Sequence, residues 1–171
     1  MKKGQLIITF LFFASISCTY AQSKVGSLRI IWENESLVDS VRFKAIMDFY
    51  LENTQSSPNS SLKLSKFHYQ LAKQLGNRKE EALALNEKAI VFHIQGYKSD
   101  SINGVLQEVL LIYTELKNSN GIASTKNNIG ALFQHQGDYQ SAINYYKEAL
   151  TLFKAQKNKL MVADVLNNIA G

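Results

Sequence analysis

ASTKNNIGALFQHQGDYQSAINYYKEALTLFKAQK, residues 123–157, contains two series of apolar and small residues joined by Gly137 and Asp138. In both series these residues recur every three or four positions, which is the spacing of a helix rather than of a strand. Glycine adopts the left-handed conformation that ends a helix, and aspartate caps the free amides that begin the next one. The stretch therefore predicts a helical hairpin.

The predicted hairpin assigns separate places to small and large side chains. Gly130 and Ala142 are small enough to let the two helices cross closely, and Phe133, Tyr139 and Tyr146 are expected to fill the space around the crossing. The expected structural positions of the unit are Ile129, Gly130, Phe133, Gly137, Tyr139, Ala142, Tyr146 and Ala149.

The spacing of these residues resembles that of the tetratricopeptide repeat, a helix–turn–helix unit of about 34 residues. The positions that carry the resemblance are Lys126, Ile129, Gly130, Phe133, Ala142, Tyr146 and Lys154. Lys126, Ile129 and Phe133 stand where the family pattern has Trp, Leu and Tyr. Lys154 replaces the proline that stops the second helix, so this helix is expected to run on for another turn.

Related segments recur along the chain at intervals of 40 or 41 residues. Asn86, Phe92 and Gly96 have counterparts 41 residues later, and NNIG at 127–130 recurs as NNIA at 167–170. Such self-similarity indicates a solenoid. We expect units at 39–77, 78–118 and 119–157, with an incomplete unit at 158–171. The resemblance implies an all-α protein, a right-handed α-solenoid of stacked helical hairpins over residues 37–171.

Residues 1–21 have the features of a secretory signal peptide. Lys2 and Lys3 precede an apolar run at 6–14, which is shorter than the roughly 20 residues of a membrane span. Cleavage is expected after Ala21, leaving residues 22–36 as a partly ordered lead-in. The predicted location is the periplasm of a Gram-negative bacterium. The alternative is a lipid anchor at Cys18, although Ser15 replaces the leucine that a lipoprotein signal favours.

The composition excludes several classes of function. The chain has 19 Lys and Arg against 14 Asp and Glu. Removal of the signal peptide takes away two lysines and the single cysteine, leaving a net charge of about +3. Basic clusters with interleaved aromatic residues are absent from the sequence, so no nucleic-acid binding is expected. A thiol-free exported chain must be stabilised by its apolar core rather than by disulfides.

The sequence also lacks motifs for catalysis. It has no glycine-rich phosphate loop, no nucleophile elbow and no paired histidines on one helix, so neither an enzyme nor a cofactor is expected. The histidines belong to different repeats, without cysteine or carboxylate at ligand spacing, and are expected at the surface or in a groove rather than at a metal: His68, His93 and His135. Three acidic residues of one helix are expected to form a solvated face: Glu80, Glu81 and Glu87.

A binding surface follows from the resemblance itself, because stacked hairpins form a concave face lined by the first helix of each repeat. Steps of four and then three residues place one stripe on this face: Asn86, Ile90, His93, Asn127, Ala131, Gln134 and Asn167. Its asparagines could bond the backbone of an extended ligand, or they could tie neighbouring repeats together. Lys126 alone is basic near this stripe, so the mode in which such repeats grip a C-terminal carboxylate is not expected.

Two compatible hypotheses of function result. The first is an exported interaction module that binds a protein or peptide partner in its groove. The second is the sensory N-terminal region of a larger protein with a histidine kinase, nucleotide cyclase or DNA-binding output, since the chain is similar to the exported repeat arms of Bacteroidetes-type signalling proteins. The helix from Lys159 has no second helix to pack on, so we expect the protein to continue beyond Gly171. Membrane contact is expected only through a later span or Cys18.

Overall fold

The computed structural model describes residues 28–170, and the regular structure within this range is helical. The predicted signal peptide (1–21, including Cys18), residues 22–27 of the lead-in and Gly171 lie outside the described residues. The chain divides after Glu52 into two compact units. This division falls inside residues 39–77, the range expected for the first repeat. The first repeat therefore stays a prediction.

The first unit contains a short helical segment at 28–33 and the helix α2 (Asp39–Asn53). Trp32 is buried and packs edge-on against Phe49, with 5.4 Å between the ring centroids. The Nε of Arg42 donates a hydrogen bond of 3.1 Å to the carbonyl oxygen of Trp32. The end of the lead-in is therefore fixed on α2 by one aromatic contact and one buried hydrogen bond, whereas Ile30 remains exposed.

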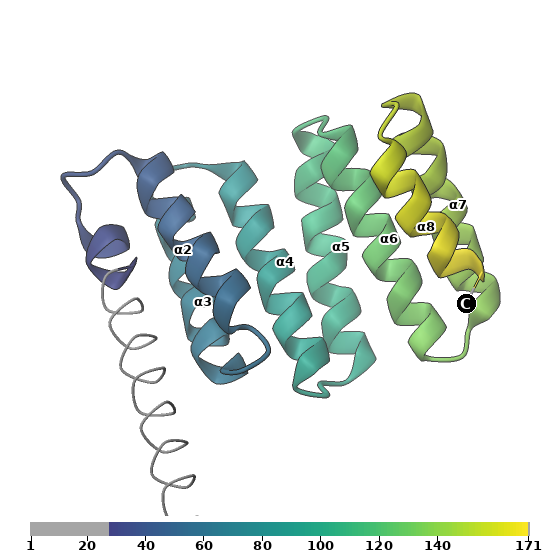
Figure 1. The fold of residues 1–171 in the computed structure, drawn as a ribbon, viewed down its shortest axis with the longest axis horizontal. Coiled ribbons are helices and arrows are strands. Elements are labelled where there is room, and N and C mark those ends of the chain that lie inside the picture. The colour runs from purple at the N-terminus through teal and green to yellow at the C-terminus, as the bar shows by residue number, and fades with distance from the viewer. Residues whose placement is uncertain (1–27, 171) are drawn as a thin grey trace, which may run out of the picture. The chain divides into compact units, whose positions relative to one another are not determined.

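The second unit is a row of helices, each packed against the next along the chain. Figure 1 shows α4 to α8 side by side, with the chain direction reversing at every turn. This arrangement confirms the predicted all-α solenoid. The helices are α3 (Pro58–Gln74), α4 (Arg78–Ile94), α5 (Ser99–Glu115), α6 (Ser119–His135), α7 (Tyr139–Ala155) and α8 (Lys159–Ala170).

The long period of the sequence has a simple structural origin. Helices α3 to α7 have 17 residues each. A repeat of about 34 residues with turns of the same length leaves only about 14 residues for each helix. Both helices of the hairpin are therefore lengthened, whereas the lysine at the proline position predicted extra length in the second helix alone.

Each turn between α3 and α8 ends its helix with the same hydrogen bond, in which a backbone N–H reaches back to the carbonyl five residues earlier. The N···O distances are 2.9 Å for Asn77 to Ala72, Tyr97 to Phe92 and Asn118 to Tyr113, and 3.0 Å for Asp138 to Phe133 and Asn158 to Phe153. The residue before each donor has a positive φ: Gly76, Gly96, Lys117, Gly137 and Lys157. The turn predicted at Gly137 and Asp138 is thus one of five similar turns.

The next helix begins on a side-chain cap at four of these turns. An oxygen of the capping residue accepts a hydrogen bond from the backbone N–H three residues later, which satisfies an amide that the helix leaves free. The caps are Asn77, Asn118, Asp138 and Asn158, at 3.3, 3.0, 3.0 and 3.2 Å from the respective nitrogens. Lys98, before α5, makes no such bond. Short local signals therefore fix both ends of most helices.

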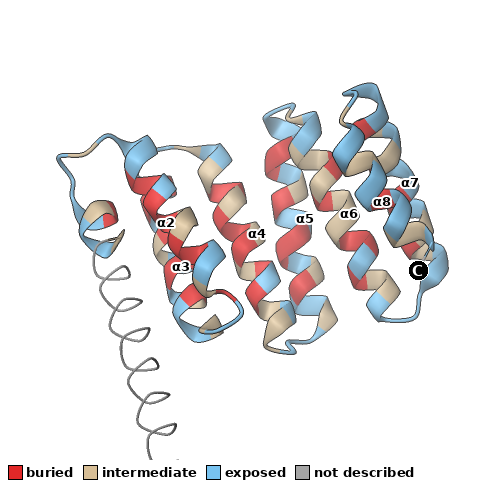
Figure 2. Ribbon diagram, in the orientation of Figure 1, coloured by how far each residue is buried: buried red, intermediate tan, exposed pale blue. Residues whose placement is uncertain are grey.

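The core follows the faces on which neighbouring helices meet, as the red segments in Figure 2 show. One cluster joins α4, α5 and α6 and includes Leu85, Val109 and Ile129. A second cluster joins α6, α7 and α8 and includes Phe153 and Val165, both fully buried. Because each cluster is shared by three successive helices, the hairpins are stabilised by their neighbours as well as internally.

Gly130 lies on α6 where the helix packs tightly against α7. A Cβ placed on this glycine would lie 2.7 Å from two ring carbons of Tyr146 and 3.2 Å from the carbonyl oxygen of Ala142. Tyr146 is fully buried, and its hydroxyl donates a hydrogen bond of 2.7 Å to Oε1 of Gln134. Gly130 is therefore required by the position of this ring, as the sequence predicts.

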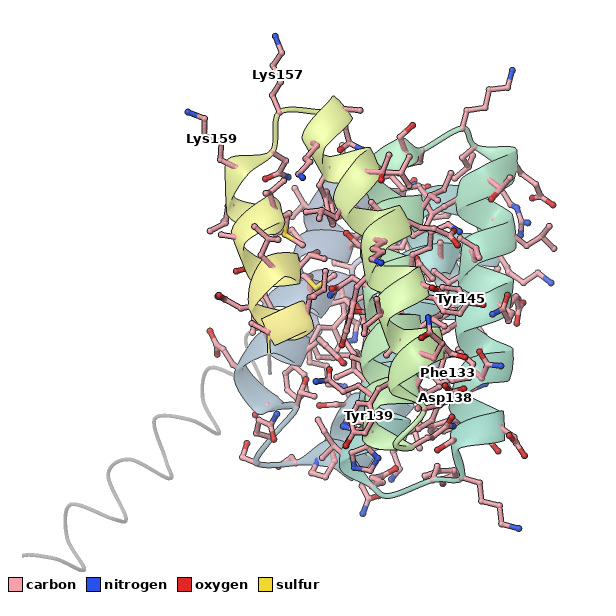
Figure 3. All side chains as sticks on the ribbon, turned by 90° about the vertical axis from the view of Figure 1, so that its right-hand side faces the viewer. Phe133, Asp138, Tyr139, Tyr145, Lys157 and Lys159 are labelled. Carbon is pink, nitrogen blue, oxygen red and sulfur yellow. The ribbon has the colours of Figure 1, made fainter. Side chains whose placement is uncertain are left out.

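Tyr139 does not have the packing role expected from the sequence. Its side chain is 64% exposed at the start of α7. The aromatic partner of Phe133 is Tyr145, whose ring lies parallel to it at 5.6 Å between centroids. Figure 3 shows Tyr139 near the turn at Asp138 and Tyr145 farther along α7. The correction has a geometric reason: the first residue of α7 precedes the part of the helix that crosses α6.

We expect Gly130→Leu to lower the free energy of unfolding by more than about 2 kcal/mol, because the added atoms overlap the buried ring of Tyr146. Gly104→Ala is the matched control. Gly104 lies in α5, and a Cβ placed on it would meet no atom within 4 Å, so alanine should stabilise the helix by about 0.5–1 kcal/mol. Urea unfolding followed by circular dichroism measures both. An unchanged midpoint for Gly130→Leu would contradict this packing.

Candidate functional site

A cleft of about 400 Å³ opens in the second unit between α4 and α6, above α5. Four residues of the stripe expected from the sequence line it: Ile90, His93, Ala131 and Gln134. Asn86, Asn127 and Asn167 do not line it. The predicted face and the cleft therefore coincide at the C-terminal halves of the first helices and not at the asparagines.

The floor and walls of the cleft are apolar. They are formed by Ala89, Ile90, Ile102, Leu106, Ala131 and Leu132. Ile90 and Ala131 are exposed. Small alanines on both helices keep the space open, and the buried Leu106 of α5 closes it from below. The cleft thus offers apolar surface that is accessible to solvent.

The rim of the cleft is polar. Its polar residues are His93, Asn128, Gln134 and His135. The rings of His93 and His135 meet edge to face, with centroids 5.2 Å apart and an interplanar angle of 82°. Among the described residues that line the cleft, none is Lys, Arg, Asp or Glu.

The asparagines of the predicted stripe connect neighbouring first helices. Asn128 Nδ2 donates to Asn86 Oδ1 at 3.0 Å, and Asn168 Nδ2 donates to Asn127 Oδ1 at 3.0 Å. The sequence left two roles open for these asparagines, bonding a ligand or tying neighbouring repeats together. The structure shows the second role for Asn86 and Asn127. Each bond adds about 1 kcal/mol net to the stability of the array. A contact of Asn167 with a ligand stays a prediction.

Six residues that line the cleft are not part of the predicted stripe: Ala89, Ile102, Leu106, Asn128, Leu132 and His135. Ile102 and Leu106 belong to α5, whereas the predicted stripe includes first helices only. Asn128 and His135 each follow a residue of the stripe by one position. The doubled asparagines of NNIG and NNIA were a signal that both positions face the neighbouring repeat.

Lys126, the basic residue expected near the groove, is not among the residues that line the cleft. Its ammonium pairs with the carboxylate of Glu148 on α7 and lies 5.9 Å from the centre of the Tyr145 ring. These two contacts hold the ammonium of Lys126 against α7. The structure therefore gives no support to recognition of a carboxylate by Lys126.

His68 corrects the expectation that all three histidines lie at the surface or in a groove. It is fully buried on α3, between two carboxylates of α4. Its Nδ1 lies 3.1 Å from both carboxylate oxygens of Glu87, and its Nε2 lies 3.1 Å from Oε2 of Glu80. The sequence prediction considered only carboxylates at ligand spacing along the sequence. His68 instead meets Glu80 and Glu87 across the interface between α3 and α4.

The acidic residues of α4 likewise do not form a solvated face. Glu81 and Glu87 are 3% and 2% exposed. Arg78 Nη1 donates to Glu81 Oε2 at 2.6 Å, and its Nη2 donates to Glu115 Oε2 of α5 at 2.7 Å. Buried carboxylates need such partners because unpaired burial of a charge is costly. The polar groups of α4 therefore join three helices.

The electrostatics of His68 follow from its two neighbours. Burial alone lowers the pKa of a histidine, but the hydrogen bonds and charges of Glu80 and Glu87 outweigh burial and raise the pKa of His68 to about 9. At neutral pH the imidazole is therefore protonated, and both of its N–H groups donate. The arrangement is a buried ion triplet.

Two further properties concern residues 28–170. No set of three or more His, Cys, Asp and Glu side chains in this range is arranged to hold a metal ion. Within the same range, the helices are too short or too polar to cross a membrane.

The family model described as the tetratricopeptide repeat matches residues 105–170, which extend from α5 to α8. The match covers the best-defined hairpin, α6 and α7, and the turns on either side of it. Residues 105–170 are therefore tetratricopeptide repeats. No curated protein matches the chain significantly. Tetratricopeptide repeats generally serve in protein–protein interaction, and here the repeats α4–α5 and α6–α7 provide the cleft.

We predict that the stability of the tetratricopeptide unit falls at alkaline pH because of His68. A group whose pKa is raised by folding, here from 6.5 to about 9, stabilises fully below the lower value and loses this contribution as pH rises through the higher one. The loss should be on the order of 3 kcal/mol. Urea unfolding at pH 6, 8 and 10 measures it.

An NMR titration of the His68 ring provides the direct check, with His68→Gln used to assign its signal. The ring should stay protonated well above pH 7 and release its proton near pH 9. Titration of His68 below pH 7, or a stability that does not change between pH 8 and 10, would contradict the ion triplet.

Proposed function

We propose that this protein binds an extended segment of a partner protein in the cleft between α4 and α6. The observation that supports this proposal is an apolar floor, open to solvent, framed by polar groups without carboxylate or ammonium charge. A concave, mostly apolar cleft with a few polar groups at its rim is the usual form of a binding site. The known use of tetratricopeptide repeats in protein interaction agrees with it.

The length of the cleft suits a short stretch of extended chain. Its polar residues on α6 run from Asn128 to His135, which is about 10 Å along a helix. An extended chain advances about 3.3 Å per residue, so about three residues would span this distance. A central apolar side chain would then lie on Ile90 and Ala131, and its burial would contribute about 1.5–3 kcal/mol.

The polar rim provides partners for the backbone of such a segment. Gln134 uses its Oε1 to accept the hydrogen bond of Tyr146, which leaves its amide nitrogen to donate. Asn128 uses its Nδ2 to donate to Asn86, which leaves its Oδ1 to accept. A buried peptide unit needs one acceptor and one donor. The rim therefore complements a peptide backbone at both ends of the cleft.

The test is a selection of random peptides on the full chain, followed by affinity measurements with two tryptophan variants. Ala131→Trp fills the cleft from its exposed wall. Ala155→Trp adds the same side chain at an exposed residue outside the cleft, at the end of α7. Peptides that use the cleft should lose at least about tenfold in affinity, about 1.4 kcal/mol, with the first variant and nothing with the second.

Circular dichroism and melting curves must show that both variants are folded like the native chain. Ile90→Glu, which places a charge on the apolar wall, gives a second variant at the same site. Selected peptides that bind Ala131→Trp and Ile90→Glu as tightly as the native chain would place binding elsewhere and overturn the proposal.

We also propose that the protein acts after export, in the periplasm. The support is the N-terminal sequence, in which two lysines precede a short apolar run and small residues follow it. In this location the cleft could serve a free-standing module or the sensory region of a larger signal-transduction protein.

Mass spectrometry of the chain recovered from its native host tests the proposed export. Cleavage after Ala21 predicts a mature N-terminus at Gln22. A chain that begins at Cys18 with an added lipid mass would support the lipoprotein alternative instead. A chain that retains Met1 and the apolar run would contradict export with cleavage.

A further inference from the structure

The two histidines on the rim of the cleft come from different repeats and yet form one cluster. His93 lies in the last turn of α4, and His135 is the last residue of α6. Their ring centroids are 5.2 Å apart, and both side chains are exposed. Because successive first helices lie side by side, a separation of 42 residues in the sequence becomes direct contact in space.

This separation suits two imidazoles that share one metal ion. Zinc lies about 2.1 Å from a histidine nitrogen, and that nitrogen lies about 1.2 Å from the centre of its ring. Two rings at about the tetrahedral angle around one ion then have centres about 5 Å apart. The observed 5.2 Å agrees with this value. In the edge-to-face arrangement the two rings do not yet direct a nitrogen to one point, so one exposed ring must turn about its side-chain bonds when the ion binds.

The surroundings also suit a cation. Both histidines lie at helix C-termini, where the backbone carbonyls give a partial negative charge that favours cations. Among the described residues that line the cleft, none is lysine or arginine. Imidazole nitrogen is a preferred ligand of zinc, copper and nickel, and it is a poor ligand for magnesium or calcium. The chemistry of the pair therefore selects late first-row transition metals.

We propose that His93 and His135 bind one divalent transition-metal ion, of the zinc, copper or nickel class, at the edge of the cleft. The protein supplies two ligands, and water or a donor group of the cleft's occupant takes the other positions. With only two protein ligands, the ion is exchangeable rather than a permanent part of the fold. This function is additional to peptide binding and does not depend on it.

The ion would join α4 to α6 directly. These first helices are otherwise connected on this face by the hydrogen bond between Asn128 and Asn86. A metal bridge at the other end of the cleft would fix the distance between its two walls. Binding to the folded state alone would also raise the melting temperature in proportion to the logarithm of the metal concentration.

The test uses the full chain without an affinity tag, with ZnCl₂ and CuCl₂ as probes. His135→Phe is the matched variant, because phenylalanine keeps a flat ring against His93 and removes both nitrogens. His93→Phe is its counterpart on α4. Calorimetric titration with Zn²⁺ gives the affinity, and electron paramagnetic resonance of bound Cu²⁺ reports how many imidazole nitrogens coordinate the ion.

The native chain should bind one Zn²⁺ and show two coordinating nitrogens on Cu²⁺. Each phenylalanine variant should lose at least about tenfold in Zn²⁺ affinity and show one nitrogen fewer, with an unchanged melting temperature in the presence of EDTA. The proposal is wrong if the native chain binds no Zn²⁺ at about 1 mM. It is equally wrong if affinity and Cu²⁺ spectrum are the same in the native chain and both variants.

Discussion

The hydrogen bond from the backbone N–H of Asp138 to the carbonyl of Phe133, repeated at four other turns, is the constraint on which the second unit depends. It ends each helix at a defined residue and turns the chain back within three or four residues. Helices of equal length and turns of three or four residues then place equivalent residues of successive repeats side by side. The asparagine ties, the cleft walls and the contact of His93 with His135 all follow from this regular spacing.

The elements of the fold could be predicted from the sequence because their signals are local. Glycine after an apolar series ends α3, α4 and α6, and a capping oxygen begins α7, so the turn at Gly137 and Asp138 was accessible without any tertiary information. The turns at Lys117 and Lys157 have no such glycine. Gly130 was accessible for a different reason: a regular spacing of small and large residues is the mark of the repeat itself. Local signals gave no information on which tyrosines of α7 pack at the crossing. The prediction named Tyr139 and Tyr146, of which Tyr146 is buried and Tyr139 is exposed, and it did not include Tyr145 beside Phe133.

The candidate site was predictable in part. A stripe at steps of four and three residues identifies the face of a first helix that borders the cleft, and Ile90, Ala131 and Gln134 line the cleft accordingly. The stripe does not show that α5 supplies the floor of the cleft or that Asn86 accepts a hydrogen bond from Asn128, because both depend on how neighbouring helices pack. The burial of His68 with Glu80 and Glu87 was missed for the same reason, because it depends on the packing of α3 against α4. Polar residues on one helix resemble a solvated face until the partner across the interface is known.

The ion triplet of His68, Glu80 and Glu87 makes the interface between α3 and α4 unlike the apolar one between α7 and α8. Repeat arrays grow and shrink in evolution when a hairpin is duplicated or deleted, and the new junction must pack as the old one did. A junction that separated α3 from α4 would leave either a buried imidazolium or two carboxylates without their counter-charge, which is far costlier than a mismatch of apolar side chains. Recombination would therefore be tolerated at the later junctions of this array, while α3 and α4 would be inherited as an inseparable pair.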